Sequence, residues 1–144
     1  MASEVVIAER FLAATLKGDG VLAGMGVYSR KRQPGTSLPA VVFINRPTRD
    51  YTTVSTARIW AEFEYIVKAI CAGSSIAPIA DAADRIDALL HGASADVYDG
   101  SVVPVRIGRV EEVVRIGPIY YDENTDDKEY RHLGGIYRVR ARAY

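Results

Sequence analysis

The residue types that most often perform catalysis are sparse in this sequence. Its two histidines, His91 and His132, form no His-x-x-x-His pair, and neither a Gly-x-Ser-x-Gly turn nor a glycine-rich phosphate loop is present. His91 follows an apolar helical pattern, where a cation favours the helix dipole and can cover the last carbonyls. His132 follows a charged segment, so we expect its ring to be solvated. The sequence therefore predicts a protein that is not an enzyme.

Sulfur and carboxylate groups do not follow a familiar metal-binding pattern either. Cys71 is the single cysteine, which excludes an internal disulfide and a cysteine-cluster zinc site. It falls on the apolar phase of its segment, so we expect a buried, unreactive thiol. The acidic residues 122–127 lack the twelve-residue EF-hand pattern and are expected at a solvated hairpin tip, with an ion at an assembly interface as the alternative. We predict no metal and no cofactor.

Charge is distributed unevenly along a chain whose 18 basic and 18 acidic side chains give a net charge of zero. A protein that coats nucleic acid through bulk charge would not be neutral. The charged side chains of residues 28–49 and 131–144 are all basic, whereas those of residues 81–99 and 122–129 are mainly acidic. The basic residues of the first block are candidates for a channel or partner face: Arg30, Lys31, Arg32, Arg46 and Arg49.

Three interpretations of these blocks stay open. Oppositely charged blocks suit head-to-tail contacts between subunits. They also suit neutralisation within one subunit, for example if Glu111 and Glu112 lie across from the arginines of residues 138–142 on a neighbouring strand. The five cations of the first block could instead face nucleic-acid phosphates.

Hydrophobic periodicity predicts the elements that must position these side chains. The 144 residues, 49% of them hydrophobic, are enough for one domain, 1–144, with its own core. No run of about 18 apolar residues predicts a membrane span, and the first four residues lack the basic start of a secretory signal. The patterns predict helices at 3–17 and about 74–91 and strands at 27–28, 40–45, 56–71, 97–98, 102–116 and 136–144. A slip in the alternation next to Gly108 predicts a β-bulge.

This order predicts an α+β single domain, with a mainly antiparallel sheet and two helices packed on one face. Residues 56–71 alternate with period two, although a helical reading through Trp60, Phe63, Val67 and Ile70 exists. As one strand they would span about 50 Å. The domain itself should be roughly 35–40 Å across, so this strand must bend or overhang and be covered by a partner.

The overhang and the charged rows define candidates for a subunit interface. Trp60 lies on the polar phase of its strand, where a tryptophan is typical of an interface anchor or of a cap on a covered face. Its polar-phase neighbours and the arginine row of the last strand complete the hypothetical interface: Trp60, Glu62, Glu64, Arg138, Arg140 and Arg142.

The whole layout resembles the tail terminator, or tail completion, proteins of long-tailed bacteriophages. An amphipathic first helix with Phe11 and Leu12 leads to a short strand, and the Leu-Pro-Ala-Val-Val-Phe run of residues 38–43 is similar to the family's Leu-Pro-x-Val-Val strand start. A long alternating strand, the alanine- and aspartate-rich residues 80–90 and a terminal strand from residue 136 follow. The chain departs from the family in its long segment 92–130.

The resemblance implies a structural virion assembly protein. It would be a ring, usually a hexamer, that caps the tail tube, stops its polymerisation and provides the surface for head–tail joining. Its partners would be further copies of itself, the tail tube protein and a head–neck connector protein, with DNA passing through the channel without specific binding and no contact with a membrane. It would be located in the tail or neck of the virion, and in the host cytoplasm during assembly.

Two other functions remain open at this point. Another neck or tail component, such as a head-closure or tail-tube protein, would share these features, but a tube protein would form long polymers. A small ligand-binding or enzymatic α+β domain would instead bind a small molecule or depend on His91 or His132.

Overall fold

The computed structural model describes residues 3–30, 37–46, 49–52, 58–125 and 127–144. It contains three helices, α1 (Glu4–Lys17), α2 (Gly20–Met25) and α3 (Ala77–Leu90). The strands are β1 (Val27–Ser29), β2 (Ala40–Asn45), β3 (Arg49–Thr52), β4 (Arg58–Ala72), β5 (Ala95–Tyr98), β6 (Arg106–Thr125) and β7 (Lys128–Ala143). The helices at residues 3–17 and 74–91 and the strands at 40–45 and 56–71 are thus found close to their predicted positions.

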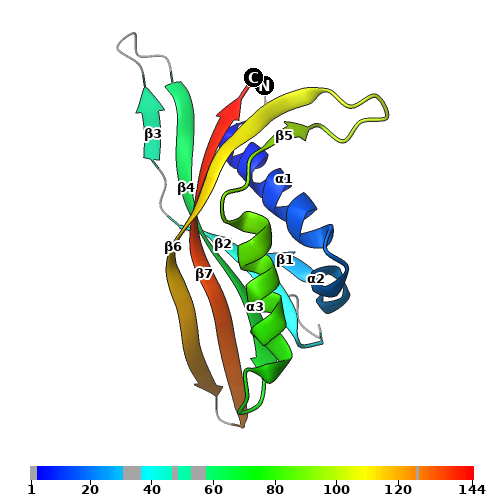
Figure 1. The fold of residues 1–144 in the computed structure, drawn as a ribbon, viewed down its shortest axis with the longest axis vertical. Coiled ribbons are helices and arrows are strands. Elements are labelled where there is room, and N and C mark those ends of the chain that lie inside the picture. Colours follow the sequence, from blue (N-terminus) through cyan, green and yellow to red (C-terminus); the bar gives the residue numbers. More distant parts are fainter. Residues whose placement is uncertain (1–2, 31–36, 47–48, 53–57, 126) are drawn as a thin grey trace.

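The strands form one sheet in the order β1-β2-β4-β7-β6-β5, and β3 pairs with β4 outside this path. The pair β1–β2 is parallel, and the other pairs are antiparallel. Figure 1 shows β6 and β7 running along the length of the molecule, with β3 beside the upper end of β4. The long strands therefore extend past the part of the sheet that the helices cover.

The fold class predicted from the sequence is wrong. Strands take up about half of the structure and form a mixed, six-strand half-barrel with only short helices, instead of a mainly antiparallel sheet with two helices packed on a face. The alternation of side chains identified the strands but does not encode the direction of a neighbour, and β1 runs parallel to β2. The twist of long strands then curls the sheet into its half-barrel shape.

The helix α2, Gly20–Met25, also differs from the prediction, which placed no helix between residues 17 and 27. Asp19 precedes this helix, and its carboxylate accepts hydrogen bonds from the backbone N–H groups of Val21 and Leu22 at 2.9 and 3.1 Å. A second contact holds the same carboxylate, since Arg85 of α3 lies 3.2 Å away. An N-cap of this kind stabilises a helix that its small residues alone would not predict.

The core lies in the concave side of the half-barrel, where α1 and α3 sit (Figure 1). The two helices contribute apolar stripes, and the central strands contribute alternate residues; the largest fully buried side chains include Ile7, Leu12, Leu16, Tyr65, Val67, Ile79, Ile86, Leu90 and Tyr137. Cys71 is buried among them, as predicted, and burial raises the pKa of its thiol. None of the described helices has the length and apolar character needed to cross a bilayer.

Strand β6 differs from its predicted range, 102–116, at both ends, since it spans Arg106–Thr125, but its predicted bulge is present. The bulge predicted beside Gly108 is confirmed, because Val97 pairs with Gly108 while the next residue, Tyr98, pairs with Arg106. Residues 102–105, predicted as the start of this strand, form a loop instead. The Asp99 carboxylate accepts hydrogen bonds from the backbone of Ser101 and Val105 and so closes a turn that competes with the sheet.

Candidate assembly surface

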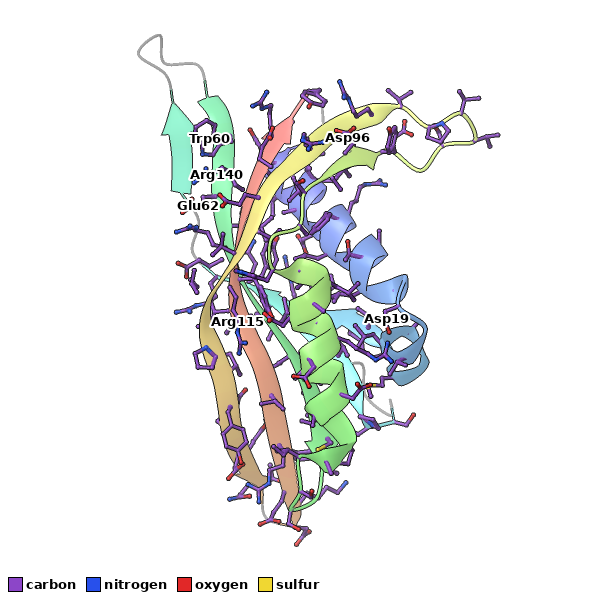
Figure 2. The ribbon with its side chains drawn as sticks, viewed as in Figure 1. Asp19, Trp60, Glu62, Asp96, Arg115 and Arg140 are labelled. Atoms are coloured by element: carbon purple, nitrogen blue, oxygen red, sulfur yellow. The ribbon has the colours of Figure 1, made fainter. Side chains whose placement is uncertain are left out.

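The six residues predicted for a subunit interface lie together on the outer face of the sheet, opposite the helices. Glu62 of β4 pairs in register with Arg140 of β7, and Glu64 pairs with Arg138. Alternation explains the shared face, since the intervening residues Ala61 and Phe63 point into the core. Figure 2 shows Trp60, Glu62 and Arg140 grouped near the overhanging end of β4.

These charged side chains form a ladder of ion pairs across three strands, which we call the charge ladder: Glu62, Glu64, Glu111, Glu112, Arg138, Arg140 and Arg142. Glu62, with a side chain 11% exposed, lies 3.7 Å from Arg138 and 3.4 Å from Arg140. Arg140 also reaches Glu112 at 3.6 Å. Arg142 reaches Glu111 at 3.2 Å. The described subunit thus neutralises its own arginine row, one of the alternatives left open by the sequence.

Trp60 extends the charge ladder at the overhanging end. The Arg140 guanidinium lies 5.3 Å from the centre of its indole ring, within the range of a cation–π contact. Trp60 pairs in register with Tyr51 of β3, the short strand beyond the edge of the half-barrel. A half-buried aromatic side chain next to paired charges gives this end of the sheet an apolar centre with a polar surround.

The five cations proposed for a channel or partner face do not gather at one place in the described residues. Lys31 and Arg32 lie outside the residues that the structure describes. Arg30 is exposed, and its backbone N–H donates to the Phe43 carbonyl at 2.8 Å. Arg46 lies 3.8 Å from Glu64, beside the charge ladder, and Arg49 pairs in register with Glu62 as part of β3.

A second surface is the lower part of the β6–β7 hairpin, residues 117–134, which we call the arm. Beyond Val110, β6 pairs with β7 alone among the described strands, because β5 pairs with β6 only between Arg106 and Val110. Tyr120 is 61% exposed, and Tyr121 is also exposed. The 20 residues of β6 span about 66 Å at ~3.3 Å per residue, longer than the domain is wide.

At the root of the arm lies a polar cluster, with His132 and Lys68 buried and Tyr121 and Glu123 exposed, that the sequence did not predict. The ring of His132 stacks on that of Tyr121, with centres 4.3 Å apart, and its Nε2 lies 2.9 Å from a Glu123 oxygen. The Lys68 ammonium donates to the Tyr121 hydroxyl. The expectation of a solvated His132 is therefore wrong, since the residue is buried between its hairpin neighbour β6 and the sequence-distant strand β4.

The surroundings of His132 also fix the direction of its titration. Burial lowers the pKa of His132 below its ordinary value, because the charged imidazolium loses water. The Lys68 ammonium lowers this pKa further, and the Glu123 carboxylate opposes both effects. The folded protein therefore favours the neutral imidazole.

The other histidine, His91, connects the end of α3 to β6. Its Nδ1 accepts a hydrogen bond from the backbone N–H of Arg115 at 3.1 Å. The Arg115 guanidinium lies 3.8 Å from Asp87 of α3, which also accepts a hydrogen bond from the buried Tyr137 hydroxyl at 3.1 Å. These contacts connect the C-terminal end of α3 to β6 and β7, next to the arm.

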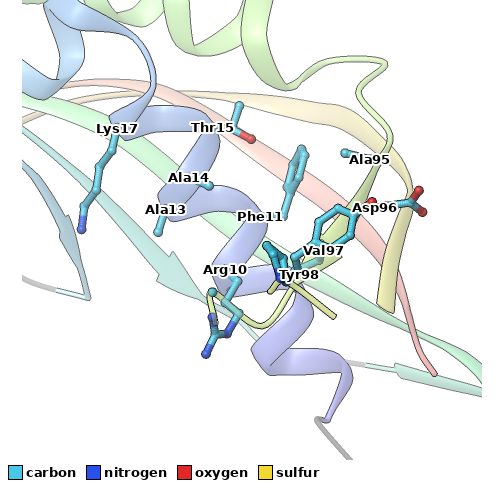
Figure 3. A pocket seen from close by; sticks show the side chains of 12 residues that line it. Arg10, Phe11, Ala13, Ala14, Thr15, Lys17, Ala95, Asp96, Val97 and Tyr98 are labelled. Carbon is cyan, nitrogen blue, oxygen red and sulfur yellow. The ribbon is translucent and has the colours of Figure 1, made fainter. Parts of the chain in front are cut away.

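The described part of the chain also carries an apolar groove of about 790 Å³ between α1 and β5. Figure 3 shows small side chains, among them Ala13 and Ala14, on the helix side and Val97 and Tyr98 on the strand side. The groove could not be predicted from the sequence, because its two walls, in α1 and β5, are far apart in the chain. Short side chains on an exposed helical face were the available signal.

Comparison with known proteins supports the fold. A scan against protein families finds no match, and a search of curated proteins finds no similar sequence. Among solved structures, the fold is similar to that of a chain in the virion of a native gene transfer agent particle. The superposition covers 91% of this chain and 91% of that chain, with a TM-score of 0.66 and 20% sequence identity. The shared fold therefore extends over nearly the entire chain, including the half-barrel and its long strands.

Proposed function

We propose that the protein is a structural component of a phage-like virion, and specifically a ring-forming tail terminator. The observation that carries this proposal is the fold shared along 91% of both chains with a component of a gene transfer agent virion. The finer role comes from the resemblance of the sequence to tail terminator proteins. In that role the ring caps the tail tube, stops its polymerisation and provides the surface for head–tail joining.

The geometry of the long strands supports a subunit that completes its sheet with a neighbour. Val113 and Arg115 of β6 bond to the Gly92 N–H and to the His91 ring, but beyond Arg115 β6 pairs with β7 alone among the described strands, and its residues from 120 to 125 are exposed. A long, exposed edge pairs readily with another chain, and natural proteins cover such edges. Gly117 and Pro118 interrupt this edge, since proline offers no backbone N–H.

The charge ladder supports a contact surface that is specific without being strongly charged. Because Glu62, Glu111 and Glu112 already offset the arginines of β7, a partner meets Trp60 in a nearly neutral surround. An apolar anchor with a polar rim is the usual composition of a protein interface. We propose Trp60 as the anchor of one subunit contact, with Glu62, Glu64, Arg138, Arg140 and Arg142 as its surround.

A ring acts here by geometry. A contact between two different surfaces closes into a ring when its rotation closes. One face of that ring would match the tail tube protein and the other a head–neck connector protein, so that no further tube ring can add. Arg30, Arg46 and Arg49 remain candidates for a channel or partner face, and a neutral subunit suits a channel through which DNA slides without being held.

The test is the mass of the purified protein by light scattering over a concentration series, with negative-stain images of the same sample. We expect a closed ring of about six subunits. Long polymers would instead identify a tube protein. A monomer at every concentration would contradict a self-assembled ring.

The Trp60 anchor is tested by Trp60→Ser, with Tyr144→Ser as its matched control. Tyr144 is an exposed aromatic residue that, like Trp60, lies beneath an arginine, since Arg106 lies 4.5 Å from its ring centre. We expect the first variant to weaken the ring and the second to leave it intact. An unchanged ring in Trp60→Ser would remove Trp60 from the interface and leave the terminator proposal standing.

A further inference from the structure

The segment between β5 and β6 presents a cluster of apolar side chains to water, which we call the valine loop (residues 99–105). Val102 is fully exposed, Val103 is 80% exposed and Val105 is 58% exposed. Figure 1 shows this segment projecting away from α1 and from the body of the molecule. Contiguous exposed apolar side chains mark interaction sites, because burying them on a partner recovers hydrophobic stabilisation.

The valine loop is held in a defined shape. The Asp99 carboxylate accepts hydrogen bonds from the backbone N–H groups of Ser101 and Val105, at 3.0 and 3.1 Å, and from the Ser101 hydroxyl at 2.7 Å. These bonds lower the pKa of Asp99, so its carboxylate stays ionised. The Arg10 guanidinium donates to the Asp99 carbonyl at 3.1 Å and ties the loop to α1. A preformed loop loses little conformational freedom on binding.

The groove between α1 and β5 has the matching character. Phe11 and Val97, both 6% exposed, belong to its lining, and the exposed Ala14 leaves room above the helix. Arg10 and Lys17 add cations to the lining, and the carboxylate of Asp96, which also belongs to it, is paired with Arg106 and Arg109. Gly100 and Pro104 also contribute to it, so the root of the valine loop meets the groove. The exposed valines of the same chain nevertheless lie outside it.

We infer that the valine loop of one copy docks in the α1–β5 groove of the next copy. The inference rests on the proposed ring and names a contact that closes it. Each chain supplies one apolar loop and one apolar groove, and a contact between two different surfaces of identical chains leads head to tail around a ring. Charge favours the same pairing, because the ionised Asp99 at the loop root can approach Lys17 of the neighbouring groove.

The first test changes the valine loop. In the double variant Val102→Asp and Val103→Asp, two carboxylates replace side chains that water already surrounds, so the fold should be retained. Docking would have to bury both charges, and we expect the concentration at half-assembly to rise by about a hundredfold or more. The matched control is Val21→Asp, an exposed valine at the start of α2, which should assemble normally.

The second test fills the groove and keeps the loop. Ala14→Trp places a large side chain on the exposed face of α1, and we expect the same loss of assembly. A mixture of the loop variant and the groove variant keeps one intact groove and one intact loop. Such a mixture should form one-to-one heterodimers and no larger species, which a general loss of folding would not produce.

The outcomes separate this contact from the ring itself. Rings of unchanged stability in the loop variant would overturn the inference and leave the proposed ring in place. Loss of assembly in both variants without heterodimers on mixing would also overturn it. A wild-type protein that stays monomeric throughout the concentration series would overturn both the inference and the proposed ring.

Discussion

The two halves of the β6–β7 hairpin differ in burial. The upper half is the part outside the arm, and the lower half is the arm itself. The upper half lies beneath α1, and only the C-terminal end of α3 reaches it; Val110 and Val139 are buried on one side and the charge ladder lies on the other. In the arm, β6 has exposed residues from 120 to 125 and a free edge, whereas β7 pairs with β4. The same two strands thus form part of the core at one end and an exposed surface, which we propose as a subunit contact, at the other. Mutations should separate stability from assembly.

The largest effect on folding is expected from the concave core. Leu12 of α1 is completely buried beneath the upper half of the hairpin. Leu12→Ala removes apolar contacts and leaves a cavity, which we expect to cost about 3 kcal/mol of unfolding free energy. Urea denaturation followed by circular dichroism measures this change. A loss below about 1 kcal/mol would mean that the core tolerates a cavity far better than its burial indicates.

The next effect is expected at the junction of the two halves, where Gly134 lies close to β4. A Cβ atom on Gly134 would stand 2.1 Å from the Val67 carbonyl oxygen and 2.6 Å from the Lys68 Cα, so the backbone would have to move. Gly134→Ala should cost about 2 kcal/mol. Gly117 is the matched control on the neighbouring strand, because a Cβ there meets no atom within 4 Å. Equal melting temperatures for the two alanine variants would contradict this account.

A smaller effect, dependent on pH, is expected from the cluster at the root of the arm. Since the pKa of His132 is lowered in the folded protein, the unfolded chain binds the proton more readily. Stability should therefore fall as the pH drops below about 6.5, by at most about 1.4 kcal/mol per pH unit. His132→Gln should flatten the profile between about pH 6.5 and pH 5.5, measured by urea denaturation. A wild-type profile that is level or rises in this range would be inconsistent with a neutral, buried imidazole.

Sequence patterns predicted the elements that form the concave core better than the segments around it. Alternation placed β4, and the apolar stripes placed α1 and α3, because each of these elements buries one continuous face. The same rules failed at residues 102–105, where alternating valines continue the strand pattern but the Asp99 hydrogen bonds form a loop. Periodicity cannot distinguish a valine that faces a core from one that faces water.

The candidate surfaces were predictable only in part. The charge ladder was foreseen as one possible pairing of Glu111 and Glu112 with the arginine row, since adjacent strands bring such rows together. The burial of His132 was not predicted, because the sequence pattern does not show that β4, with Lys68, packs against the hairpin in which Tyr121 and His132 face each other. The direction of β1 and the curvature of the half-barrel likewise depend on pairings between distant segments.

The smallest effect on folding, and the clearest separation of the two halves, is expected at Tyr120 in the arm. This side chain is 61% exposed and lies on the strand with the free edge. Tyr120→Ser should change the unfolding free energy by no more than about 0.5 kcal/mol, because little of the side chain is buried in the monomer. If the arm is covered in the assembled ring, the same change should weaken assembly, since aromatic side chains contribute strongly when an interface buries them. Light scattering and urea denaturation on the same preparations measure both quantities. A Tyr120→Ser protein that unfolds as easily as Leu12→Ala would place the arm within the folding core and contradict the division drawn here.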